Sequence, residues 1–139
     1  MRLLIPRNSA GDGIVKLGML FAFGLALAST VSIVAHAEGN PAKGKIVFFQ
    51  CMACHSVAAG KNGIGPSLHG LFGRKAGTAP DFAYSPSMKR SGITWDEASL
   101  KSYLPDPQAK VLGTKMAFLG LHDPEKVDNL IAYLKQATK

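Results

Sequence analysis

The sequence predicts an all-α domain, with about four to five short helices joined by long loops. Three observations support this class. Asn40-Pro41, Ser85-Pro86 and Asp123-Pro124 each pair a capping side chain with a proline suited to the first helical turn. The last of these starts precedes apolar residues at helical spacing. No segment alternates apolar and polar residues as a half-buried strand does.

Two helices are expected in the first part of the domain. One begins at Asn40-Pro41 and carries the apolar run 46–49, and the other begins at Ser85-Pro86 and ends near Gly92. Residues 56–86 hold six glycines and three prolines with no sustained period. Such a long loop fits a compact domain when it wraps a large ligand that completes the core.

Two further helices are expected near the C-terminus. Thr94 and Glu97 have the spacing of a capping box, which predicts a helix with Thr94 as its N-cap that stops at Pro105. Residues 111–122 are expected to be irregular because glycines interrupt them. The final helix follows Asp123-Pro124, and one of its faces is apolar: Val127, Leu130, Ile131 and Leu134.

Residues 1–37 have the composition of a secretory signal peptide. Three basic residues precede an uncharged, largely apolar run of 18 residues, and the run ends in Ala35-His36-Ala37, the small-residue pattern of a cleavage site. An uncleaved membrane anchor is the alternative, because 18 residues are at the lower limit for crossing a bilayer. The sequence therefore predicts export to the periplasm, with residues 38–139 as the functional domain.

Composition excludes several classes of protein. A chain of 139 residues, 47% of them hydrophobic, is not disordered and has room for one domain. Two cysteines are too few for a disulfide-rich scaffold or a four-cysteine zinc module. The formal net charge of +7 is compatible with nucleic-acid binding, but no recognition motif or aromatic ladder accompanies it.

Both cysteines lie in Cys51-Met52-Ala53-Cys54-His55, a C-x-x-C-H sequence. Residues three apart share a helical face, so both sulfurs can reach one flat ligand, as in the covalent attachment of a c-type haem. His55 can then place its imidazole under the iron. A structural disulfide, a redox dithiol and half of a zinc site are the alternatives. The export signal and the long loop favour one covalently bound haem c.

The sixth position of the iron distinguishes an electron carrier from a ligand-binding haem enzyme. Met52 lies between the attachment cysteines and cannot reach the opposite face, and Met88 is expected to be a core residue. His69 and His122 are expected to be surface or loop residues. Met116 lies in a glycine-punctuated loop with enough chain before it to reach the far face, so the residues favour Met116.

Five segments of the chain resemble class I cytochrome c, most closely the mitochondrial type and its small periplasmic relatives in bacteria. They follow the family order, and the resemblance covers essentially all of residues 40–139. The segments are Cys51 to His55, the ten residues from Gly65-Pro66 to Arg74, Gly92-Ile93-Thr94-Trp95, Gly113-Thr114-Lys115-Met116, and the five residues from Leu130 to Leu134.

The resemblance implies the cytochrome c fold and a role for each matching residue. His55 and Met116 would be the axial ligands of the iron, and Cys51 and Cys54 would form the covalent thioethers. The carbonyl of Pro66 would accept a hydrogen bond from the other ring nitrogen of His55. Further haem contacts are implied on the propionates for Arg74, Tyr84 and Trp95, and on the methionine side for Tyr103 and Thr114.

The resemblance also implies that Gly44 and Phe48 cross the last helix at Leu130 and Tyr133. Two residues depart from the family pattern. Leu112 stands where many relatives have proline, which affects the stiffness of the Met116 loop. Met88 stands where many have asparagine, which affects the polarity of the haem pocket.

The expected function is that of a soluble monohaem electron carrier rather than an enzyme, serving a respiratory or photosynthetic chain. An iron held on both faces by protein has no open site for substrate. The basic residues would steer a monomeric protein onto acidic docking surfaces of membrane oxidases, reductases or dehydrogenases. A haem enzyme or gas sensor with a labile sixth ligand is the alternative, and Leu112 is its only support.

Overall fold

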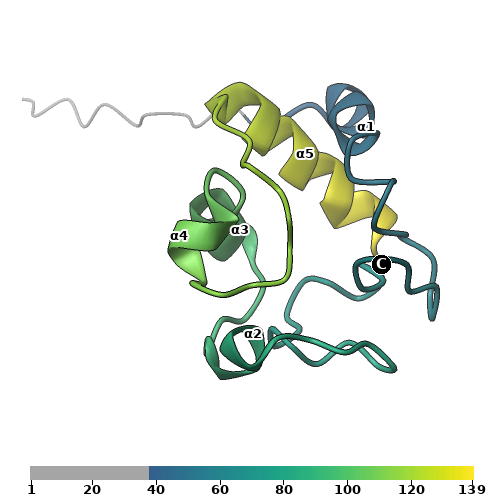
Figure 1. Cartoon of the computed structure of the whole chain (residues 1–139). Coiled ribbons are helices and arrows are strands. Elements are labelled where there is room, and N and C mark those ends of the chain that lie inside the picture. Colours follow the sequence, from purple (N-terminus) through teal and green to yellow (C-terminus); the bar gives the residue numbers. More distant parts are fainter. Residues whose placement is uncertain (1–37) are drawn as a thin grey trace, which may run out of the picture. The chain divides into compact units, whose positions relative to one another are not determined.

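The computed structural model describes residues 38–139, and the predicted signal peptide lies outside them. The described chain forms five helices and no strand, which confirms the all-α class. An isolated β-bridge joins Lys75 and Thr94. The helices, shown in Figure 1, are α1 (Pro41–Phe48), α2 (Pro86–Arg90), α3 (Glu97–Tyr103), α4 (Pro107–Lys110) and α5 (Pro124–Ala137).

Three helices begin where the sequence predicts, because a side chain replaces the missing hydrogen-bond partners of the first turn. Asn40 Oδ1 accepts from the N–H groups of Ala42 and Lys43 at 2.9 and 3.1 Å. Ser85 caps α2 and Asp123 caps α5 in the same way. Each cap acts within three residues, so the local sequence is enough to mark these starts.

The predicted N-cap of α3 is wrong: α3 begins at Glu97 with Asp96 as its cap. Asp96 Oδ1 accepts from the N–H of Ser99 at 2.7 Å, and Ser99 Oγ accepts from the N–H of Asp96 at 2.8 Å. The main chain of Trp95 is instead paired with the loop, donating to the carbonyl of Arg74 at 2.9 Å. Because these residues are extended against the loop, the helix cannot start at Thr94.

Helix α4 is a single turn that the sequence analysis did not identify. The prolines at positions 105 and 107 predict the end of the preceding helix, but Asp106-Pro107 also has the same cap-and-proline pattern as the other starts. Asp106 Oδ1 accepts from the N–H of Ala109 at 2.9 Å, and Pro107 is fully buried. The cap and the buried proline therefore fix the position of the chain directly before the Met116 loop.

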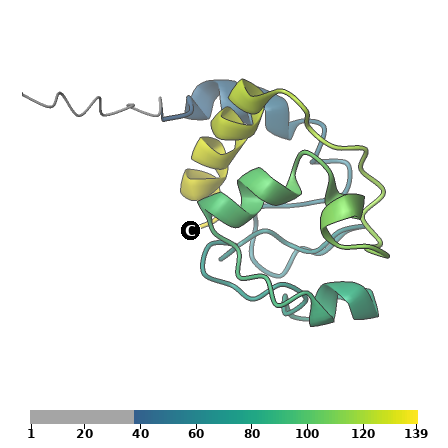
Figure 2. The same ribbon diagram turned by 90° about the vertical axis from the view of Figure 1, so that its left-hand side faces the viewer.

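Helices α1 and α5 pack closely, as Figures 1 and 2 show from two directions. A Cβ added at Gly44 would overlap the carbonyl oxygen of Asn129 and lie 2.8 Å from Cβ of Tyr133. The rings of Phe48 and Tyr133 are 5.3 Å apart at 45°. Leu130 of α5 is fully buried. The absence of a side chain at Gly44 therefore sets the distance between the two helices.

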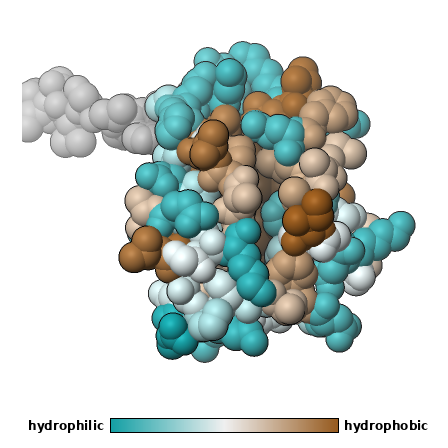
Figure 3. All heavy atoms as spheres, in the orientation of Figure 1, coloured by the Kyte–Doolittle hydropathy of each residue, from teal (hydrophilic) through white to brown (hydrophobic). Residues whose placement is uncertain are grey.

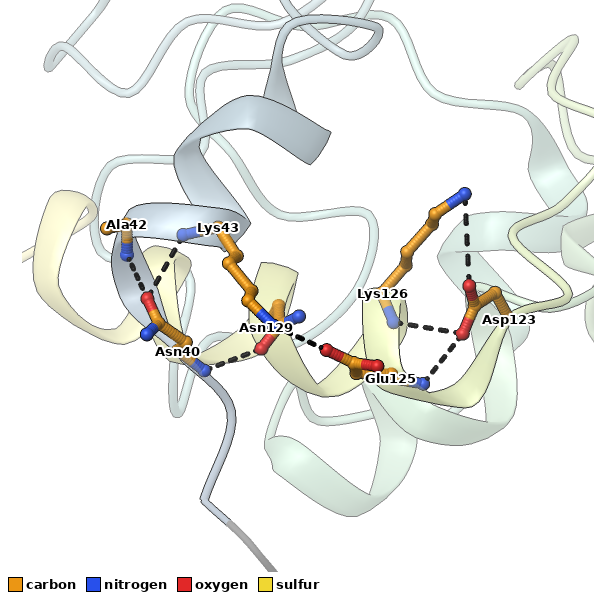
Figure 4. A network of polar contacts seen from close by, with 7 residues as sticks. All are labelled: Asn40, Ala42, Lys43, Asp123, Glu125, Lys126 and Asn129. Atoms are coloured by element: carbon orange, nitrogen blue, oxygen red, sulfur yellow. Dashed lines mark hydrogen bonds and ion pairs between the residues drawn. The ribbon is translucent and has the colours of Figure 1, made fainter.

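Polar contacts hold the N-terminal end of α1 on α5 (Figure 4). Asn129 is buried, and its Oδ1 accepts from the backbone N–H of Asn40 at 2.6 Å. At the surface, Lys43 Nζ lies 2.9 Å from a carboxylate oxygen of Glu125. Asn40 thus caps α1 and is itself held by α5, so the capped start of the domain depends on its last helix.

Ion pairs connect α3 with α5. Lys101 of α3 lies 2.9 Å from Asp128, and Lys135 of α5 lies 2.8 Å from Glu97. Both carboxylates are on the surface or close to it, so the pairs contribute little to stability and weaken in salt. Below this layer, the rings of Trp95 and Tyr103 meet edge to face with centroids 5.0 Å apart.

Candidate functional site

The C-x-x-C-H segment continues directly from α1 as helical turns. The N–H of Cys51 donates to the carbonyl of Phe48 at 2.8 Å. The N–H groups of Cys54 and His55 both donate to the carbonyl of Cys51, at 3.1 and 2.8 Å. These bonds bring two thiols and one imidazole onto a single half-buried turn, the arrangement that attachment of one flat ligand requires.

The chemistry of the two thiols does not suit a redox dithiol. Both cysteines are free and half-buried. Burial, and then the neighbouring charge of Cys54, raises the pKa of the Cys51 thiol to about 11. A catalytic C-x-x-C pair needs the opposite, a lowered pKa that supplies thiolate. Within residues 38–139, no three His, Cys, Asp or Glu side chains cluster as a zinc site would require.

His55 is held in one orientation. Its Nδ1 lies 2.8 Å from the carbonyl oxygen of Pro66. A carbonyl only accepts, so Nδ1 carries the hydrogen and Nε2 keeps its lone pair. Burial lowers the pKa of His55, although the hydrogen bond to Pro66 opposes this shift. The neutral imidazole therefore offers Nε2 as a metal ligand.

Gly65 packs against the ring of His55, a contact that the sequence analysis did not predict. A Cβ added at Gly65 would lie 2.7 Å from Nδ1 and 2.8 Å from Nε2 of the imidazole. The N–H of Gly65 donates to the carbonyl of Cys54 at 2.9 Å, which ties the loop to the C-x-x-C-H turn. The Gly65-Pro66 pair was part of the resemblance, but nothing in it alone indicates this close approach.

Met116 is half-buried against the core, on the loop between α4 and α5. The hydroxyl of Tyr103 donates to its sulfur at 3.4 Å. Burial raises the pKa of Tyr103, against a hydrogen bond with Thr114, so its phenol remains a donor at neutral pH. Gln108 Nε2 donates to the carbonyl of Met116 at 2.9 Å, a contact that the sequence analysis did not predict.

The other candidate ligands lie elsewhere. Met88 is buried in α2 as a core residue, in agreement with the sequence analysis. Met52 is exposed, as are His69 and His122. The carbonyl of His69 accepts from Arg74 at 2.7 Å, which gives this residue a structural role in the loop. Met116 is therefore the candidate with both a half-buried thioether and a side-chain donor facing its sulfur.

Arg74 has one nitrogen that the protein leaves without a partner. Its two terminal nitrogens donate to the carbonyls of His69 and Ser67 at 2.7 and 3.0 Å, whereas its buried Nε makes no hydrogen bond. A buried polar atom of this kind normally has an acceptor. Tyr84 is close enough for the Arg74 charge to oppose the rise that burial causes in its pKa. A carboxylate group of a bound ligand fits this position.

Two surface hollows of the described domain lie away from the C-x-x-C-H turn and Met116. These hollows, of about 450 and 460 Å³, lie beside α1 and α5, and neither is lined by Cys51, Cys54, His55 or Met116. In the part of the chain that is described, no helix has the length and apolar character needed to cross a membrane.

Paired thiols and an oriented imidazole on one turn, with an unpartnered arginine nitrogen that suits a propionate, define a c-type haem protein. The family model for cytochrome c matches residues 41–138. Cytochrome c2 of Blastochloris viridis is 52% identical over 106 residues, 76% of this chain and 84% of that protein. Cytochrome c-550 of Bradyrhizobium diazoefficiens is 52% identical over 99 residues, 70% of this chain and 73% of that protein.

A solved structure supports the same conclusion. Cytochrome cH from Methylobacterium extorquens is 53% identical, with a TM-score of 0.66, and the match covers 70% of this chain and 98% of that one. The chain belongs to the cytochrome c family, class I. It has the cytochrome c fold, binds one haem c covalently and is a monohaem electron-carrier cytochrome.

Proposed function

We propose that this cytochrome shuttles single electrons between redox partners in the periplasm through an iron held by His55 and Met116. The observation that carries the proposal is the pair of oriented donors described above. Pro66 fixes the tautomer of His55, and Tyr103 donates to the sulfur of Met116. When bound, the haem supplies a one-electron ferric–ferrous couple. With His55 and Met116 both holding the iron, no position would remain for a substrate, and the chemistry left to the site would be electron transfer.

The two proposed ligands, His55 and Met116, would also set the direction in which the reduction potential moves. A thioether ligand favours the reduced iron, so Met116 raises the potential. The hydrogen bond from His55 Nδ1–H to Pro66 makes the imidazole a better donor. The Tyr103 hydroxyl competes for the electron density of the Met116 sulfur. The chain's residues thus tune the couple without taking part in a bond change.

Arg74, Tyr84 and Trp95 would bind the haem propionates. Buried carboxylates need a charge partner or hydrogen bonds, and Arg74 Nε is an unused donor. Trp95 is buried against Tyr103, which links this end of the site to the methionine side. Thr114 and Tyr103 would line that side, since each makes a hydrogen bond with Met116.

Unpaired basic residues would direct the protein to acidic partners such as membrane oxidases, reductases or dehydrogenases. Ion pairs engage Lys43, Lys101, Lys126 and Lys135. The remaining exposed cations of residues 38–139 include Lys45, Lys61, Lys75, Lys89, Arg90 and Lys110. Hydrophobic surface is interspersed among hydrophilic groups on the face in Figure 3. We expect rates with an acidic partner to fall steeply with salt, and rates with a neutral partner to change little.

Residues 1–37 would direct export and then be removed. The mass of the native protein tests this and the attachment of haem together. The expected mass is that of residues 38–139 plus one haem. The mass of the complete chain plus one haem would instead indicate a retained anchor.

The absorption spectrum of the oxidised protein tests the ligand pair. We expect the red sulfur-to-iron charge-transfer band in the unmodified protein and its loss in Met116→Ala, which keeps covalent haem but binds imidazole readily. Met52→Ala is the matched control, because Met52 is exposed and should leave the band intact. Rapid carbon monoxide binding to the unmodified reduced protein would favour the alternative, a haem enzyme or sensor with a labile sixth ligand.

A further inference from the structure

The loop that carries Met116 has few restraints of its own. Its first turn is closed by the N–H of Thr114, which donates to the carbonyl of Val111 at 2.9 Å. The next backbone–backbone hydrogen bond within the described chain is made by Leu121, which donates to Leu104 at 2.9 Å. The main chain of residues 115–120 therefore depends on side chains for its position.

Gln108 supplies the side-chain contact that ties the backbone of Met116 to a helix. Its Nε2 lies 2.9 Å from the carbonyl of Met116 and, in a longer contact, 3.4 Å from the carbonyl of Thr114. One amide group thus spans both ends of the short segment that presents the sulfur. Lys115, between them, anchors to a different loop through the carbonyl of Ala83 at 3.1 Å.

The turn that carries Gln108 is anchored at both ends. Gln108 sits in α4 directly after Pro107, which is fully buried. The helix is capped by Asp106 and closed by the N–H of Val111, which donates to the carbonyl of Pro107 at 3.0 Å. A displacement of the Met116 backbone relative to α4 would therefore lengthen or break the amide contact.

We propose that Gln108 is a positioning residue that restrains the Met116 loop and so lowers the rate and extent of exchange of the sulfur for an external ligand of the iron. The inference rests on the proposed ligation by Met116 and assigns its regulation to one exposed amide. Since Leu112 leaves the loop without a proline at its first turn, the amide provides stiffness that the backbone lacks.

The restraint can be measured by competition between external imidazole and the Met116 sulfur for the iron. External imidazole binds only when the sulfur has left, so its apparent dissociation constant equals the intrinsic value divided by the open fraction. Loss of one side-chain hydrogen bond raises the open fraction about threefold to tenfold. We expect Gln108→Leu to lower the imidazole concentration at half-displacement of the sulfur-to-iron band by this factor. The band without imidazole should be unchanged.

The Gln108→Glu variant distinguishes a residue that restrains the Met116 loop, here called a clamp, from one that only forms part of the surface of α4. A carboxylate has the same shape but no N–H, and its oxygens would face the carbonyls of Met116 and Thr114. A clamp therefore predicts a midpoint at or below that of the leucine variant. If Gln108 only formed part of the helix, Gln108→Glu would not lower the imidazole midpoint, because a carboxylate is favourable in a first helical turn. Gln136→Leu, on the exposed side of α5, is the matched control and should keep the original midpoint.

The outcomes distinguish the restraint by Gln108 from the ligation by Met116. An intact band in the unmodified protein, with midpoints unchanged in both Gln108 variants, would refute the clamp and leave the ligation standing. A missing band in the unmodified protein would refute ligation by Met116 and the clamp with it. A lowered midpoint in Gln136→Leu as well would show a general loosening of the fold and would also overturn the clamp.

Discussion

Replacing Leu112 with proline should stabilise the protein. Leu112 occupies the second position of the turn 111–114, in which the N–H of Thr114 donates to Val111 and Gly113 has a φ of +81°. This is the geometry of a turn that requires glycine at its third position and favours proline at its second. Val111, with φ −133° and ψ 84°, lies outside the helical region that a following proline disfavours.

The magnitude follows from what the substitution removes. The side chain of Leu112 is 85% exposed, so its loss costs little packing. Its N–H makes no hydrogen bond within residues 38–139, so the missing donor also costs little. What remains is the lower entropy of the unfolded chain, worth about 0.4–1 kcal/mol. For a domain of this size that corresponds to a rise in Tm of about 2–5 °C.

Thermal unfolding of the oxidised protein, followed by circular dichroism, is the assay. Leu112→Ala is the control, because it removes the same exposed side chain without fixing the backbone, and it should leave the Tm nearly unchanged. A Tm of Leu112→Pro at or below that of the unmodified protein would refute the assignment of this turn. The proline should also raise the imidazole midpoint, since it stiffens the loop that holds the proposed ligand.

Three further predictions follow from close contacts and surface charge. Gly44→Ala should lower the free energy of unfolding by about 1–3 kcal/mol in a denaturant titration, because its Cβ would overlap the main chain of α5; an unchanged midpoint would contradict that packing. Gly65→Ala should displace the ring of His55 and change the visible spectrum; a spectrum identical to that of the unmodified protein would rule out the close approach. Glu97→Gln should cause a small, salt-sensitive loss of stability at neutral pH. Because hydrogen bonds to lysines, first that of Lys135, lower the folded-state pKa of Glu97, this loss should vanish as the pH falls through that pKa; a loss that persists in acid would contradict it.

Sequence alone predicts the features of this domain that depend on neighbouring residues. Asn40 and Ser85 mark helix starts correctly because a cap acts within three residues. The predicted start of α3 was wrong because two capping patterns overlap there. The pairing of Trp95 with the loop at Arg74 decides between them. Helix α4 was missed because its cap-and-proline signal coincides with the end of the preceding helix.

The same distinction applies to the site: contacts between neighbouring residues can be predicted from the sequence, and contacts between distant segments cannot. The thiols and the imidazole are adjacent in sequence, so the C-x-x-C-H spacing indicates their chemistry directly. The amide contact of Gln108 and the packing of Gly65 under His55 depend on loop conformations that no local pattern encodes. The hydrogen bond from His55 to Pro66 was expected only from the family resemblance, and the structure has it at 2.8 Å.

The proposed electron transfer depends on ligation of the iron by Met116, and NMR of the reduced protein tests this ligation most directly. With methyl-labelled methionine, a methyl group bound over the porphyrin face is shifted far upfield by the ring current. Ligation by Met116 predicts one such resonance, absent from the Met116→Leu variant and present in Met52→Leu. If every methionine methyl appeared in the ordinary region, or if the shifted signal survived Met116→Leu, the iron would be held in another way.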